Sequence, residues 1–142
     1  MASKLRQRDF PLAAHYHGKT RVRVLKVHRE ASGKHKLCEY SVQTTLFSEL
    51  YGRVFTHERN DGLVATDTQK TTVYVVAKRT AAATPEQFGI DLAQHFLAQY
   101  PVLSAVEIEV RQTLWDRVRV GSEAHDHGFV LNSPEKAKAV VR

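Results

Sequence analysis

The sequence predicts an α+β fold in which helices pack on one face of a mostly antiparallel sheet. Two observations indicate this class. Segments that alternate apolar and polar residues, as half-buried strands do, lie near both ends of the chain, and segments with helical spacing lie between them. The 142 residues, 42% of them apolar, suffice for one globular domain with a core. The predicted order is two strands, a helical middle and two strands.

The first predicted strand covers residues 21–28 (RVRVLKVH). Its apolar side chains begin on one face at Val22 and Val24 and move to the other face from Leu25 onward. This change of phase predicts either a strand that is covered on both faces or a β-bulge.

The second predicted strand follows a turn at residues 31–34 and forms a hairpin with the first. Its alternation places five side chains on one face: Cys38, Tyr40, Val42, Thr44 and Leu46. Cys38 is the only cysteine, so it cannot form an internal disulfide. Its place on an apolar face predicts a buried, unreactive thiol.

Residues 64–78 (VATDTQKTTVYVVAK) carry two conflicting signals. Thr66 and Gln69 have the spacing of a capping box, which predicts a helix with Thr66 and Asp67 at its start. The residues that follow are β-branched and aromatic, and these favour a strand. Local propensity alone leaves both interpretations open.

The helix signal is strongest over residues 85–100. Thr84 is the expected cap, Pro85 occupies the first helical position, and Gln87 completes a capping box. The predicted core-facing stripe contains Phe88, Leu92, Phe96 and Tyr100, widened by Gly89, Ala93 and Leu97.

A third strand is predicted over residues 102–114, where one face carries Val106, Ile108, Val110, Gln112 and Leu114. A short apolar run at 129–131 follows the turn-like residues 125–128, and residues 139–142 resemble the beginning of a last strand. Because an unfinished strand leaves unpaired edge groups, we expect the chain to be part of something longer or to close against another chain.

The chain is basic, with 21 Lys and Arg residues, 15 Asp and Glu residues and a formal charge of +6. We expect residues 1–14 to form a basic, flexible arm before a single domain over residues 15–142. A basic surface attracts anions. Nucleic-acid binding would require a known motif or stacking aromatics, so we expect small anions and no nucleic acid. Without a long apolar run or a secretory signal, we also expect no membrane partner and an intracellular protein.

His125, Asp126 and His127 form the most metal-like cluster, since two imidazoles and a carboxylate can ligate a first-row ion. A site needs further ligands that no motif supplies, so we expect a turn or packing role and no metal. Phosphate-loop and nucleophile-elbow motifs are both missing from the sequence. The start of the helix at Thr66 either only caps the helix or binds an anion through its free amides.

Four blocks occur in the order and spacing of one enzyme family: HGK leading into RVRVLKVHRE, then VATDTQKTTVYVVAK, FGIDLAQHFLAQY, and LWDR followed by HDHGF. The chain resembles the amino-terminal half of the urate oxidases (uricases) over nearly its whole length. The resemblance implies the T-fold, an antiparallel four-stranded sheet with two helices on one face. It also favours a helix from Thr66, with Val73, Val76, Ala77 and Thr80 toward the sheet.

The resemblance implies an activity as well. Uricases oxidise urate with molecular oxygen to 5-hydroxyisourate and hydrogen peroxide, without a metal or an organic cofactor. They are homotetramers whose sheets close into barrels around a tunnel. The family's catalytic lysine matches Lys19, and its substrate-binding Thr-Asp pair matches Thr66 and Asp67. In the family the threonine also relays protons with the lysine and a histidine.

That histidine and the other pocket residues belong to the second half of a uricase, so we expect this chain to supply one side of a site that a complementary carboxy-terminal half completes. Three interpretations stay open: a split uricase, a truncated one, or a stand-alone T-fold subunit that binds a purine or pterin or acts as a scaffold. We favour the first two because an unpaired sheet edge is costly. The family's location is the cytoplasm in bacteria and the peroxisome in eukaryotes, and we expect the cytoplasm.

Overall fold

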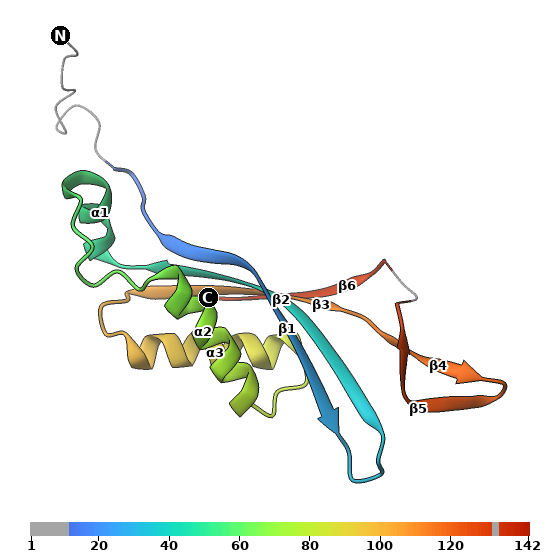
Figure 1. The fold of residues 1–142 in the computed structure, drawn as a ribbon. Coiled ribbons are helices and arrows are strands. Elements are labelled where there is room, and N and C mark those ends of the chain that lie inside the picture. The colour runs from blue at the N-terminus through green and yellow to red at the C-terminus, as the bar shows by residue number, and fades with distance from the viewer. Residues whose placement is uncertain (1–11, 132–133) are drawn as a thin grey trace.

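The structure is a computed structural model that describes residues 12–131 and 134–142 (Figure 1). The expected basic arm, residues 1–14, therefore lies almost entirely outside the described residues. The elements are β1 (His17–Arg29), β2 (His35–Phe47), the 3-10 helix η1 (Glu49–Tyr51), α1 (Gly52–His57), α2 (Thr66–Arg79), α3 (Pro85–Gln99), β3 (Ala105–Thr113), β4 (Asp116–Val120), β5 (Glu123–Val130) and β6 (Lys136–Val141).

Four strands form the main sheet, in the order β1-β2-β3-β6, and every neighbouring pair is antiparallel. Helices α2 and α3 cover one face of this sheet, with α2 packed against β1 and α3 against β3 and β6 (Figure 1). The predicted α+β class, with a four-stranded antiparallel sheet and two helices on one face, is confirmed. None of the helices in the described ranges is long and apolar enough to cross a membrane.

The core lies between the sheet and the two helices. The predicted face of β2 is buried from Cys38 to Leu46, and the Cys38 thiol is fully buried as expected. Strand β3 contributes Val106, Ile108 and Val110 to the same core. The predicted stripe does not continue to Leu114, which is 38% exposed, because β3 ends at Thr113.

Strand β1 contains a bulge that reorients its first half. Lys19 is opposite Thr44, whereas Val22 is opposite Val42, so three steps along β1 match two steps along β2. Arg21, within the bulge, has a φ of 57°. The extra residue turns Lys19 and Val22 to the same, helix-covered face. The predicted bulge exists, but it precedes Val22; Leu25 is 64% exposed and the pairing around it is regular.

Helix α2 begins at Thr66, as predicted, but the capping box is wrong. The N-cap position is Ala65, which makes no side-chain cap bond, and Thr66 is the first helical residue. Gln69 is fully buried and hydrogen-bonds elsewhere. Val73 and Val76 favour a strand by local propensity, but in the helix both side chains are buried in the core. Packing therefore overrides propensity in this segment.

Helix α3 is confirmed, with one half of its capping box. Thr84 Oγ1 accepts a hydrogen bond from the Gln87 amide at 3.3 Å, while the Gln87 side chain donates to Asp91 instead of returning to the cap. Phe88, Leu92 and Phe96 are buried as predicted, but Leu97 is 46% exposed and does not widen the stripe.

A hairpin of β4 and β5 was not predicted. The sequence indicated only a short apolar run at 129–131, whereas β5 spans Glu123–Val130 and pairs with β4 as a separate two-stranded sheet. This hairpin projects beyond the end of the main sheet (Figure 1). Helix α1 was missed too; both elements are largely exposed, so neither imposes a periodic apolar pattern on the sequence.

Candidate functional site

The residue before Lys19 is a glycine for a steric reason. A Cβ atom on Gly18 would lie 2.2 Å from the carbonyl oxygen of Thr44 on β2, far inside van der Waals contact. Only glycine permits this approach of β1 to β2. The HGK block therefore combines a backbone requirement with the partly buried lysine that follows it.

The amino-terminal end of α2 carries the other two predicted site residues. Thr66 is partly buried and Asp67 is exposed. The first intrahelical bond there runs from the Gln69 amide to the Ala65 carbonyl, so the amides of the preceding residues have no partner within the helix. Free amides at the positive end of a helix dipole favour an anion.

A chain of hydrogen bonds, partly buried at Lys19 and fully buried from Thr44 onward, joins these two elements. The Lys19 backbone amide donates to Thr44 Oγ1 at 3.3 Å, and the Thr44 hydroxyl donates to Gln69 Oε1 at 2.7 Å. Gln69 Nε2 then donates to the Val64 carbonyl oxygen at 2.9 Å, just before α2 begins. The structure thus connects the strand segment of Lys19 with the start of the helix that carries Thr66 and Asp67.

This connection was missed by the sequence analysis, although a signal for it exists. Thr44 occupies a core position in β2 between apolar neighbours, and it is 1% exposed. A buried hydroxyl requires a hydrogen-bond partner. The threonine at this position therefore predicts a polar group on a facing element, and Gln69 supplies it.

An imidazole lies on the same strand as the lysine. His17 is two residues before Lys19, and its ring packs edge-on against Tyr51 with the centroids 6.1 Å apart. His17 Nε2 is buried and has no hydrogen-bond partner among the described residues. Burial raises the pKa of the Tyr51 hydroxyl, so the phenol stays neutral at ordinary pH.

The histidines of the HDHG segment have the turn and packing roles predicted for them. His125 Nδ1 accepts hydrogen bonds from the amides of His127 and Gly128, at 3.1 and 2.9 Å. His127 Nε2 bonds the Gly33 carbonyl oxygen at 3.1 Å and docks β5 on the β1–β2 turn. Within the described ranges, no group of three or more His, Cys, Asp or Glu side chains is arranged to hold a metal ion.

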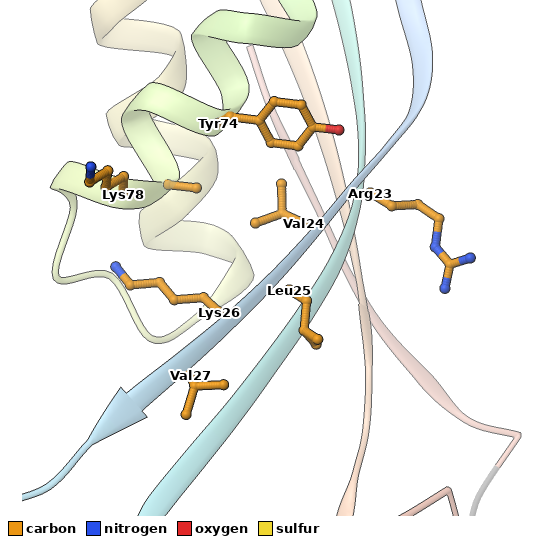
Figure 2. A pocket seen from close by; sticks show the side chains of 8 residues that line it. Arg23, Val24, Leu25, Lys26, Val27, Tyr74 and Lys78 are labelled. Atoms are coloured by element: carbon orange, nitrogen blue, oxygen red, sulfur yellow. The ribbon is translucent and has the colours of Figure 1, made fainter.

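A hollow of about 390 Å³ lies elsewhere on β1, between this strand and the later turns of α2. Figure 2 shows Tyr74 and Lys78 of α2 on one side and residues 23–27 of β1 on the other. Lys26 reaches across and donates to the Thr80 carbonyl oxygen. Because neither Lys19 nor the start of α2 lines this hollow, it is distinct from the predicted site.

The chain is similar to uricases over most of its length. A family model described as Uricase matches residues 15–142. The chain is 39% identical to Uricase-2 isozyme 1 of Glycine max over 126 residues, which are 88% of this chain and 40% of that protein. It is 35% identical to the uricase of Aspergillus flavus over 130 residues, 91% of this chain and 42% of that protein.

A solved structure agrees with these relatives. The crystal structure of uricase from Arthrobacter globiformis matches with a TM-score of 0.81 at 33% identity, over 92% of this chain and 43% of that chain. The chain therefore spans about two fifths of the length of the curated relatives that it matches.

Proposed function

Because the chain belongs to the uricase family and has the T-fold of that family, we propose that it supplies one side of a urate-oxidising site. The observation that carries the proposal is the buried connection between the strand of Lys19 and the start of α2. It holds an ammonium-bearing strand and an anion-binding helix end in one unit. Lys19 and Thr66 are the catalytic residues, and Thr66 and Asp67 bind the substrate.

The proposed roles follow from the chemistry of urate. Urate must lose protons before it is electron-rich enough to reduce oxygen, so a nearby Lys19 ammonium stabilises the anion. The hydroxyl of Thr66 passes the urate proton to the neutral amine of Lys19, which thereby becomes the ammonium that stabilises the anion. The Asp67 amide, at the free end of α2, donates to the purine edge. Urate, oxygen and water then give 5-hydroxyisourate and hydrogen peroxide, with two electrons passing from the purine to oxygen.

The remaining wall of the pocket comes from a partner. The relatives are more than twice as long as this chain, and we propose that a complementary uricase half supplies the stacking and relay groups. Copies of the two halves assemble as a tetramer whose sheets close into a barrel. Oxygen is the co-substrate, and the proposed reaction uses neither a metal nor an organic cofactor.

The test is to co-express the chain with the carboxy-terminal half of Arthrobacter globiformis uricase and to follow urate absorbance and oxygen uptake. Lys19→Ala and Thr66→Ala should each lower the rate about 100-fold or more, because each removes a proton-transfer group. Lys36→Ala, at an exposed site on β2, is the matched control and should leave the rate unchanged. Activity that survives both site substitutions would overturn the assignment.

A further inference from the structure

We propose that Gln69 is a positioning residue, whose buried carboxamide sets the position of the α2 start relative to the Lys19 segment of β1. Its effect on catalysis rests on the function proposed above. Gln69 belongs to α2, but both of its side-chain hydrogen bonds leave the helix. It therefore connects Lys19, through Thr44, with Val64, two residues before the helix begins.

The burial of this connection makes it stiff. Gln69 is 0% exposed and Thr44 is 1% exposed, so water does not compete for either group. Their bond is 2.7 Å long, and the bond from Gln69 to the Val64 carbonyl is 2.9 Å. A buried polar group that loses its partner is costly, which resists any shift that would break these bonds.

The middle of α2 contacts the sheet without this directionality, and the hydrogen bond from Lys26 of β1 to the Thr80 carbonyl oxygen lies at the opposite end of the helix. Val73, Val76 and Ala77 pack on the sheet as apolar side chains, and apolar burial depends on area and hardly on orientation. Such a surface tolerates small sliding movements of the helix. The hydrogen bonds of Gln69 prevent these at the end of α2 where Thr66 and Asp67 lie.

The position matters because the proposed chemistry moves a proton between groups on two different elements. A displacement of about 1 Å at a reacting group can cost about 100-fold in rate. Thr44 holds the Lys19 amide, and Gln69 holds Thr44. A change at Gln69 therefore alters the site without removing any atom that touches the substrate.

The test uses the chain co-expressed with the carboxy-terminal uricase half, and three substitutions that keep the side-chain volume. Gln69→Met and Thr44→Val remove the two sides of the connection. Thr72→Val is the matched control, because Thr72 is also buried in α2 but its hydroxyl bonds the Thr68 carbonyl within the same helix, at 2.8 Å. Stability is measured for each variant by urea unfolding.

We expect Gln69→Met and Thr44→Val to lower kcat about 10- to 100-fold with little change in KM, since substrate contacts remain. The double variant should be no slower than the slower single variant, because both changes break one connection. Thr72→Val should leave kcat unchanged, and it should cost less stability because the Thr68 carbonyl keeps its partner within the helix. Equal kcat values for Gln69→Met and Thr72→Val would overturn the proposal.

A second readout needs no catalysis. In the 142-residue chain as it stands, Gln69→Met should accelerate amide hydrogen exchange at Lys19 and at Gln69 about tenfold more than Thr72→Val does. If the exchange result holds while the wild-type pair lacks urate oxidation, the proposed function fails and the positioning role stands. If exchange at Lys19 does not distinguish the two variants, the positioning role is wrong whatever the enzyme does.

Discussion

The main sheet and the β4–β5 hairpin are held in place by different forces. The sheet is covered by α2 and α3, and its inner face is a continuous apolar core. The hairpin is exposed along most of both strands, and polar contacts attach it to the β1–β2 turn. Arg117 donates to the His35 carbonyl at the start of β2 and, within the hairpin, to the carbonyls of His125 and Asp126, while His127 bonds Gly33 in the turn. Apolar burial therefore holds the main sheet in place, and a few hydrogen bonds hold the β4–β5 hairpin.

The largest expected difference between the two regions is in core truncation. Phe96 is 0% exposed beneath the sheet, and Phe96→Ala should lower the free energy of unfolding by about 3–5 kcal/mol through lost burial and a cavity. Val120 in the hairpin is 67% exposed, and Val120→Ala should change the free energy of unfolding by less than about 0.5 kcal/mol. Urea unfolding of both variants measures the difference, and comparable losses would contradict it.

Glycine substitutions should also destabilise the main sheet more than the β4–β5 hairpin. Gly18→Ala drives a Cβ atom against the Thr44 carbonyl and should cost about 3 kcal/mol, because the β1–β2 backbone must move apart. Gly121 in the β4–β5 turn has a φ of 62° but open space around it. Gly121→Ala should therefore cost only the left-handed penalty of about 1–2 kcal/mol. Thermal unfolding of both variants checks the order, and a larger loss at Gly121 would contradict it.

The hairpin contacts can be broken without unfolding the sheet. Arg117→Ala removes three carbonyl contacts and a guanidinium that lies 5.3 Å from the centre of the Phe129 ring. Amide exchange in residues 116–130 should rise about tenfold, while the amides of β2 stay protected. Arg119→Ala is the control, since among the described residues its side chain bonds only the nearby Ser122 carbonyl. If β2 loses protection in Arg117→Ala, the two regions are one cooperative unit.

The same difference explains what the sequence could and could not predict. The face from Cys38 to Leu46 had to alternate because one side is buried, so the hairpin and its inner face were predictable. The residues of β4 and β5 are mostly exposed, so no periodicity marks them. The β1 bulge left a trace as a change of phase, but nothing in the sequence located it at Arg21.

The candidate site was predictable to a smaller extent. The family motifs pointed to Lys19, Thr66 and Asp67, and the structure places them on packed elements joined through Thr44. The role of Gln69 was misread, because a glutamine three residues after a threonine fits a capping box as well as a buried bridge. Local spacing cannot distinguish these two roles, since the partner of Gln69 lies 25 residues away along the chain.

The smallest expected effect is a pH dependence at the contact between the β4–β5 hairpin and the start of β2. The rings of His35 and His127 are 4.3 Å apart where β5 meets the β1–β2 turn. Loss of hydration and the nearby positive charges of His127, Arg29 and Arg117 lower the pKa of His35 below its usual value. A lowered histidine pKa contributes stability that is present above the unfolded value of about 6.5 and is lost as pH falls through the folded value.

In an NMR titration, His35 should therefore have its midpoint below 6.5, and His127→Gln should move that midpoint upward while Arg119→Ala leaves it in place. Acidification in this range also acts on His28 of β1, whose pKa is lowered by burial and by the nearby Lys26 and Lys36. The edge of the sheet at β3 and β6, where Lys138 lowers the pKa of the Glu109 carboxylate, responds only at a more acidic pH. A midpoint unchanged by His127→Gln would show that the His127 ring does not lower the pKa of His35.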